Sequence, residues 1–251
     1  MALAPPSQDV LDFVARVAHA YAKLIASPCA DGESGLGGCL FYAGEMDEEG
    51  RALVVAANVA GAATLVASAD RAAQKQAIRD GIADFLVTSL DESLRILKNQ
   101  LRKRETVSVC VAMAPAAIER EMNERGVLPD LLRSAMDDTS RIGTESPALL
   151  TWSVASAPAL WLPQLDAIAL ECLDADAWAA RRWLRLAPRY LGRMAQGTRA
   201  LAFACSQEVA SCFIEQVKKR VERGDIGVPV EVRWGDPHGR EEKHDFEPVK
   251  P

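Results

Sequence analysis

The chain has 251 residues, of which 49% are hydrophobic and 25% are charged, as in ordinary globular proteins. The net charge of −6 argues against a nucleic-acid partner held by an overall positive field, and no apolar run reaches the length of a membrane span. Because the N-terminus lacks a basic flank followed by an apolar core, we expect a cytoplasmic protein that does not associate with a membrane.

The first 38 residues predict a helix and a linker. Ser7 can cap a helix in which apolar side chains recur every three or four residues, from Val10 to Leu24. Residues 27–38 are rich in turn formers, and the glycines among them precede the first predicted strand instead of following it. We therefore expect an amphipathic helix, then a mobile linker, and then the main domain.

From residue 39 to residue 234, short apolar runs alternate with amphipathic stretches. The predicted strands cover residues 39–44, 62–68, 84–89, 107–114, 148–154, 165–173, 199–205 and 228–234. The predicted helices cover residues 45–61, 71–80, 90–101, 115–126, 174–196 and 208–224. This alternation predicts an α/β fold: a three-layer Rossmann-like sandwich with one mostly parallel sheet over residues 39–234, followed by a flexible tail at 235–251.

Five short motifs stand out between residues 40 and 140. They are an Ala-Gly after the first strand, an Ala-Gly-Ala closing the first helix, an aspartate after the second strand, a Leu-Asp-Glu helix start and an Arg-Gly-Val-x-Pro-Asp-Leu run. In this chain they fall at 43–44, 60–62, 70, 90–92 and 125–131. Together they resemble the central NAD-binding domain of urocanase, the urocanate hydratase of histidine breakdown. The resemblance implies a Rossmann-like domain.

The resemblance also implies a phosphate-binding turn that this sequence has lost. Urocanases hold the NAD phosphates with a G-L-G-G-M-G-G turn, whereas the matching residues 44–50 keep glycine only at the first and last positions. The turn instead carries four carboxylates, which repel phosphates and stabilise the dipole of an unliganded helix. They are Glu45, Asp47, Glu48 and Glu49.

Other cofactor contacts implied by the resemblance are missing as well. The family's ribose-binding glutamate falls on Ser68, the arginine that follows it on Gln74, and the asparagine after the fourth strand on Pro115. In the T-D-Q-T-S-A-H motif, Asp138 and Ile142 stand for the glutamine and the histidine, while Thr139 and Ser140 are kept. We therefore expect neither NAD nor another cofactor. The flanking urocanase domains, with their catalytic cysteine motif, find no counterpart.

Two sets of residues are candidates for a binding site. The first set lies where the predicted strands end, the edge at which open α/β sheets bind ligands, and comprises Glu45, Asp70, Ser89 and Ser206. The second set lies on one face of the helix predicted at 174–196 and comprises Trp178, Arg181, Arg182, Arg185, Arg189 and Arg193. An aromatic ring among guanidinium groups suits an anionic small molecule or an acidic protein partner. The alternative is a solvated face paired with acidic residues.

The cysteines and histidines point to no metal chemistry. The six cysteines form no C-x-x-C pair and lie mainly in predicted strands, so we expect free thiols and no disulfide. A metal site in the tail would use Asp236, His238 and His244. The alternative is a solvated tail that binds no metal.

The favoured function is therefore a non-catalytic binding or assembly module derived from a urocanase-like cofactor domain, forming a homo-oligomer. The alternative is an enzyme, or a nucleotide-binding or small-anion-binding protein, that uses the C-terminal edge of the sheet. The polar residues at that edge form no recognisable triad or metal set. Urocanate hydratase activity is the least favoured reading.

Overall fold

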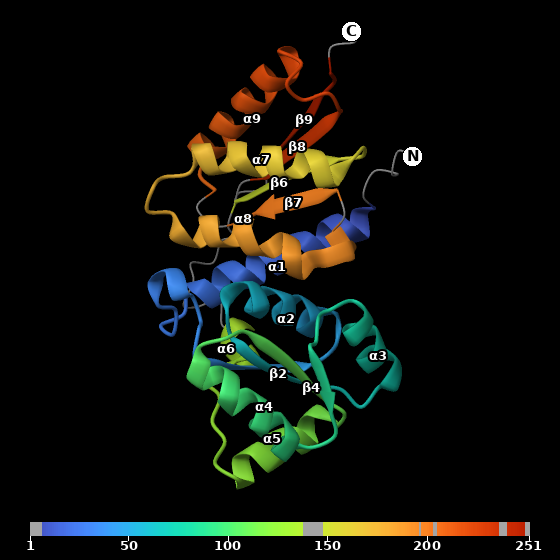
Figure 1. The fold of residues 1–251 in the computed structure, drawn as a ribbon, viewed down its shortest axis with the longest axis vertical. Coiled ribbons are helices and arrows are strands. Elements are labelled where there is room, and N and C mark those ends of the chain that lie inside the picture. Colours follow the sequence, from blue (N-terminus) through green and yellow to red (C-terminus); the bar gives the residue numbers. More distant parts are fainter. Residues whose placement is uncertain (1–6, 138–147, 196, 203–204, 236–239, 249–251) are drawn as a thin grey trace. The chain divides into compact units, whose positions relative to one another are not determined.

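The computed structural model describes residues 7–137, 148–195, 197–202, 205–235 and 240–248. The chain divides into two compact units, one made of Ala20–Thr144 and the other of Met1–His19 with Glu145–Pro251. We name them the parallel-sheet unit and the antiparallel-sheet unit after their sheets (Figure 1). The first helix, α1 (Gln8–Ile25), contributes to both. The expectation of a single domain over residues 39–234 is thus replaced by a division after residue 144.

In the parallel-sheet unit the described strand pairings are all parallel, and the strand order is β3-β4-β2-β1-β5. The strands are β1 (Leu40–Glu45), β2 (Ala63–Ala67), β3 (Phe85–Val87), β4 (Val107–Val111) and β5 (Leu131–Leu132). The helices are η1 (Gly32–Ser34), α2 (Glu48–Ala60), α3 (Arg71–Arg79), α4 (Leu90–Lys103), α5 (Pro115–Glu124) and α6 (Arg133–Asp137). Figure 1 shows α2 over one face of the sheet and α4 with α5 over the other. The predicted three-layer Rossmann-like sandwich is confirmed for this unit.

Local sequence explains how this unit folds. β2 is buried along its whole length, as a central strand of a parallel sheet covered on both faces must be. α2 ends at Gly61, whose φ of 97° lies in the left-handed region that favours glycine. Leu65, Val109 and Ile118 are fully buried in the apolar core cluster that joins the sheet to α4 and α5. The alternation of apolar runs and helices therefore places the core correctly.

Residues 27–38, predicted to be a mobile linker, pack onto the parallel-sheet unit. Leu36 is fully buried, and its N–H donates to the carbonyl of Ala60 at 2.8 Å. Arg104 Nε donates to the carbonyl of Gly37 at 3.1 Å. These contacts join residues far apart in the sequence, so the turn-rich composition of the segment does not reveal them.

In the antiparallel-sheet unit the described strands pair antiparallel in the order β7-β6-β8-β9. The strands are β6 (Leu149–Val154), β7 (Thr198–Leu201), β8 (Val230–Gly235) and β9 (Glu241–Phe246). The helices besides α1 are α7 (Pro158–Cys172), α8 (Trp178–Leu191), η2 (Gly192–Ala195) and α9 (Gln207–Glu222). Trp152 of β6 packs against Phe213 of α9, with ring centroids 4.9 Å apart. This contact lies in the core of the unit, where both side chains are fully buried.

A buried ion pair crosses this core. Arg199 Nε donates to Asp166 Oδ2 at 3.2 Å, and Trp152 Nε1 donates to Asp166 Oδ1 at 3.2 Å. The two charged side chains are 13% and 12% exposed. Burial raises the pKa of Asp166, although Arg199 and the two hydrogen bonds act to lower it.

The expectation of one mostly parallel sheet is wrong for the C-terminal half. Of residues 165–173, predicted to be a strand, 165–172 lie in helix α7, which has Pro158 in its first turn and Leu173 as its C-cap. A short apolar run does not by itself distinguish a buried strand from a buried helix. Because α7 and α8 are consecutive helices, the chain makes one extra pass and returns antiparallel to β6. The missed helix therefore also explains the missed strand direction.

The composition of residues 235–251 predicts a flexible tail, but part of this segment forms a strand. Residues 241–246 form β9, which pairs with β8 from Val230↔Phe246 to Gly235↔Glu241. Exposure alternates along β9, and its charged side chains suit an edge strand that must not recruit another chain. None of the described helices combines the length and the apolar composition needed to cross a membrane.

The expectation of six free thiols is also wrong. A disulfide joins Cys172 of α7 to Cys212 of α9, with the two Cα atoms 5.9 Å apart, a normal separation for such a bridge. The other four cysteines are free: Cys29, Cys39, Cys110 and Cys205. The bridge joins residues 40 positions apart, so no local pattern in the sequence reveals it.

Candidate functional site

The turn between β1 and α2 is the place where a Rossmann-like unit holds a phosphate. In this chain Asp47 caps α2, and its Oδ1 accepts from the N–H of Gly50 at 2.7 Å. Glu48 and Glu49 follow in the first turn of the helix. A Cβ atom at Gly50 would collide with the carbonyl oxygen of Glu45, so this glycine is needed for close approach of strand and helix. The prediction that the acids stabilise the helix terminus agrees with this geometry.

Arg133, at the start of α6, completes the turn. Its two terminal nitrogens donate to the two oxygens of Asp47, Nη1 to Oδ1 at 3.0 Å and Nη2 to Oδ2 at 3.1 Å. Nη1 also lies 3.4 Å from the carbonyl oxygen of Glu45. The Arg133 side chain covers Gly44, where an added Cβ would lie 3.2 Å from Arg133 Cδ. A bidentate pair of this kind fixes both the position and the orientation of the carboxylate.

The charge state of Asp47 reflects these contacts. Partial burial acts to raise its pKa, but the hydrogen bonds from Arg133 and from the N–H of Gly50 outweigh it, so the pKa lies below the ordinary value. Asp47 is therefore an anion at neutral pH. It occupies the N-terminus of α2 as a phosphate would, and a guanidinium neutralises it.

The turn after β2 is built by the residues that replace the family's ribose contacts. The N–H of Asp70 donates to Ser68 Oγ at 3.2 Å, and Gln74 Nε2 donates to the carbonyl of Ser68 at 2.7 Å. Ser68 and Gln74 are both buried. The polar groups at these two positions thus hold the turn itself. Pro115, which replaces the asparagine, lies in the first turn of α5.

A cavity of about 600 Å³ opens beside the β1–α2 turn, between the ends of β1 and β5 and the length of α5. At its floor the Tyr42 hydroxyl donates to Glu119 Oε1 at 3.1 Å. Burial, followed by the negative charge of Glu119, raises the pKa of Tyr42, so the phenol stays protonated. Met122, Val127 and Leu132 supply an apolar wall.

Sequence reasoning missed the residues that shape this cavity. Tyr42 lies inside an apolar strand, and Glu119 lies on an ordinary amphipathic helix, so neither belongs to a motif. Arg133 lies 86 residues from its partner Asp47. The available signal was positional, because Arg133 directly follows a strand at the edge where parallel strands end.

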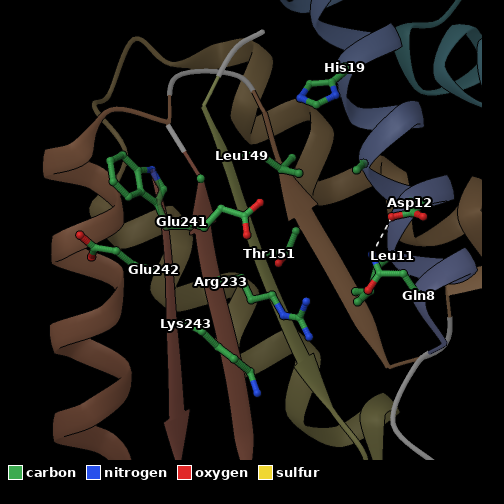
Figure 2. Close-up of a pocket in the computed structure, with 13 residues that line it drawn as sticks. Gln8, Leu11, Asp12, His19, Leu149, Thr151, Arg233, Glu241, Glu242 and Lys243 are labelled. Atoms are coloured by element: carbon green, nitrogen blue, oxygen red, sulfur yellow. Dashed lines mark hydrogen bonds between the residues drawn. The ribbon is translucent and has the colours of Figure 1, made fainter. Parts of the chain in front are cut away.

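A second cavity, of about 510 Å³, lies within the antiparallel-sheet unit. Figure 2 shows it between β6, β8 and β9 and the part of α1 that carries Asp12 and His19. Two basic side chains of this cavity already bind a carboxylate: Arg233 and Lys243 bind the two oxygens of Glu231 at 2.7 and 3.0 Å.

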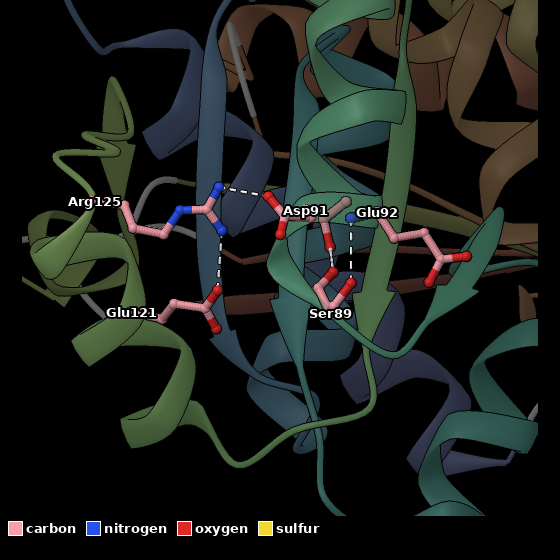
Figure 3. A network of polar contacts seen from close by, with 6 residues as sticks. Ser89, Asp91, Glu92, Glu121 and Arg125 are labelled. Carbon is pink, nitrogen blue, oxygen red and sulfur yellow. Dashed lines mark hydrogen bonds and ion pairs between the residues drawn. The ribbon is translucent and has the colours of Figure 1, made fainter.

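The structure does not gather the four predicted edge residues. Glu45, Asp70 and Ser89 lie in the parallel-sheet unit, whereas Ser206 lies in the antiparallel-sheet unit. Ser89 caps α4 by accepting from the N–H of Glu92 at 3.3 Å (Figure 3). Asp70 and Ser206 cap α3 and α9 in the same way, at 2.8 and 3.2 Å. Ser206 follows a strand of the antiparallel sheet, so it does not share a sheet edge with the other three residues.

The network in Figure 3 is structural. Arg125 donates to Asp91 Oδ1 at 2.5 Å and to Glu121 Oε1 at 3.0 Å, and it thereby links α5 to the first turn of α4. The contact fixes α5 at the side of the cavity where Glu119 lies. It is exposed, so we assign it a positioning role and little stabilisation.

The arginines of α8 have different surroundings. Arg181 donates to the carbonyls of Leu173 and Asp174 at 2.9 and 3.1 Å, which satisfies the C-terminal end of α7. Arg189 lies over its own neighbour Tyr190, 5.4 Å from the ring centroid. Arg185 is exposed, Arg182 and Trp178 are half-buried, and the side chain of Arg193 is outside the described residues.

Two further predictions fall partly outside the described residues. Asp138, Thr139, Ser140 and Ile142 of the degraded motif lie there, as do Asp236 and His238 of the tail metal site. Among the described residues, no group of three or more His, Cys, Asp or Glu side chains is placed to hold a metal. His244, on β9, lies 3.7 Å from Glu242.

The parallel sheet, its crossover helices and the β1–α2 turn define a Rossmann-like α/β module. A family model described as the urocanase Rossmann-like domain matches residues 21–141. The resemblance to urocanase is therefore confirmed for this segment, which is slightly less than half of the chain. The antiparallel-sheet residues from 145 onward lie outside the match.

Proposed function

We propose that this chain is a non-catalytic binding module that has kept the urocanase-like Rossmann unit and given up its dinucleotide. The observation that carries the proposal is the Asp47–Arg133 pair at the N-terminus of α2. A pyrophosphate bound there would have to displace a carboxylate that accepts from Gly50 and from both terminal nitrogens of Arg133. It would also approach Glu48 and Glu49, whose charges oppose it.

Isothermal titration calorimetry with NAD and NADH tests the proposal on the full chain. We expect no binding heat at millimolar nucleotide, and no loss of urocanate absorbance in a parallel ultraviolet assay. A micromolar Kd, or measurable urocanate turnover, would contradict the proposal and would show that the turn opens for phosphate.

A binding module of this kind suits a homo-oligomer, and the edge strand β3 supports that part of the proposal. β3 pairs only with β4 among the described strands, and its Phe85 and Leu86 are 45% and 41% exposed. An uncharged, apolar edge favours pairing with the same edge of a second copy. Light scattering should therefore find a dimer that Phe85→Glu converts to monomer. A monomeric wild-type chain at micromolar concentration would contradict this part.

A further inference from the structure

The cavity beside the β1–α2 turn has the position of a ligand site. β1 connects through α2 to β2 on one side, whereas β5, on the other side of β1, is reached from β4 through α5. Ligands of open α/β sheets bind where strand connections diverge in this way, at the carboxyl ends of the strands. Gly44 and Glu45 end β1 there, and Leu132 ends β5.

The charges that line this cavity are predominantly negative. Glu45 and Glu119 both line it, and both act on the phenol of Tyr42 by raising its pKa. Arg133 is the one basic residue among the described lining residues, and it is paired with Asp47 on both of its terminal nitrogens. A negatively charged group would therefore meet two carboxylates and a cation whose charge is already compensated.

The remaining walls are apolar or neutral. Met122, Val127 and Leu132 line one side, and Leu128 stands at the rim with 80% of its surface exposed. Asn123 adds an amide carbonyl that can accept a hydrogen bond. The cavity thus combines acceptors and negative charge near Tyr42 with apolar side chains, and its volume of about 600 Å³ suits a small organic molecule.

We propose that this cavity binds a small organic cation, a primary amine that carries an apolar body. The ammonium group donates to Glu119 and Glu45, and the apolar body packs against Met122 and Leu132. The proposal deepens the proposed function and rests on it, because it names the ligand class of the binding module. It differs from the alternative of a nucleotide or small anion at this edge of the sheet.

Calorimetry on the full chain with a matched pair of probes tests the charge preference. 3-Phenylpropylamine and 3-phenylpropionate share an apolar body and differ in the sign of their charge. We expect the Kd of the amine to be at least about tenfold lower than that of the carboxylate. Equal binding of the two probes, tighter binding of the carboxylate, or no binding of the amine would overturn the proposal.

Variants at the two carboxylates locate the site. Glu119→Gln removes the charge but keeps an acceptor for the Tyr42 hydroxyl, so the fold should remain intact, and amine affinity should fall about tenfold. Glu45→Gln should act in the same direction. Glu124→Gln is the matched control, because Glu124 ends α5 but does not line the cavity. Amine binding that survives both cavity variants, or falls equally with the control, would overturn the assignment.

These outcomes are distinct from those of the NAD titration. If the chain binds neither NAD nor amines, the proposed loss of dinucleotide binding stands and only the proposed ligand class is contradicted. If the chain binds NAD, the proposed function is contradicted, whatever the amine result.

Discussion

The two units each contain an aspartate–arginine pair, and the pairs differ in where they lie. In the parallel-sheet unit the pair caps a helix at the surface, with Asp47 45% and Arg133 25% exposed on their side chains. In the antiparallel-sheet unit Asp166 and Arg199 lie in the core beside Trp152. Hydrogen bonds lower the pKa of Asp47 against its partial burial, whereas burial dominates at Asp166 and raises its pKa. The same two residue types thus cap a helix at the surface in one unit and form a largely buried pair in the core of the other.

The largest expected effect is the loss of the core pair. Arg199→Ala leaves the buried Asp166 carboxylate without its cation, and we expect the free energy of unfolding to fall by about 3–5 kcal/mol. All five tryptophans lie after residue 145, so tryptophan fluorescence in a urea titration reports this unit. If Arg199→Ala lowers the free energy of unfolding by no more than the loss of a surface ion pair does, the buried pair does not differ from the surface pair in stability, which would contradict this prediction.

Removal of the Cys172–Cys212 disulfide should cause the next largest loss of stability. Cys172 and Cys212 are separated by 40 residues, and a loop of that length predicts about 4 kcal/mol of stabilisation from chain entropy. Cys172→Ser with Cys212→Ser should therefore lower the urea midpoint of the tryptophan transition. A urea midpoint equal to that of the wild-type chain would contradict this prediction.

The surface pair has a smaller effect. Asp47→Ala removes both the helix cap and the partner of Arg133, and we expect a loss of about 1–2 kcal/mol, close to that of other caps. Glu49→Gln, two residues along in the same helix turn, is the control and should change stability by less than about 0.5 kcal/mol. Thermal unfolding followed by circular dichroism distinguishes the two. Equal losses would mean that the Asp47 contacts contribute nothing.

The pH dependence of the stability of Asp47→Ala tests whether the charge of Asp47 contributes. Because the folded pKa of Asp47 lies below its unfolded value, its contribution is fully present above the unfolded pKa and is lost as the pH falls through the folded pKa. The stability difference between wild type and Asp47→Ala should therefore stay constant from pH 6 down to about 4, near the unfolded pKa, and shrink as the pH falls further. A difference that also stays constant below about pH 4 would show that the charge of Asp47 is not involved.

The smallest expected effect is at the arginines of α8. Arg185 is exposed and has no described ion pair, so Arg185→Glu should change stability by less than about 0.5 kcal/mol. Arg181→Ala should cost more, because Arg181 satisfies carbonyls at the end of α7. Urea titrations of the two variants would contradict the assignment if their order were reversed.

The sequence predicts the parallel-sheet unit well because its elements follow local rules. Apolar strands, the cap at Ser89 and the left-handed Gly61 are each visible within a few residues. The failures come from contacts or ambiguities that no short window resolves. The run at 165–173 has the composition of either a strand or a buried helix, and β9 forms only because β8 offers it an edge.

Some features of the candidate site can likewise be predicted from the sequence, and others cannot. The carboxylates of the β1–α2 turn and the loss of its glycines are readable from the sequence, and so is the expectation that the turn rejects phosphate. The role of Arg133 is not readable, because its contact with Asp47 spans 86 residues. The Tyr42–Glu119 contact, which spans 77 residues, is hidden for the same reason.

The central claim is that Asp47 occupies the place of a phosphate. The most direct test is calorimetric titration of ADP-ribose into the wild-type chain and into Asp47→Ala. We expect no binding to the wild type and weak binding to the variant, because removing the carboxylate leaves the N-terminus of α2 without its cap and Arg133 without its Asp47 partner. Binding of ADP-ribose to the wild type with a micromolar Kd, unchanged in the variant, would contradict it.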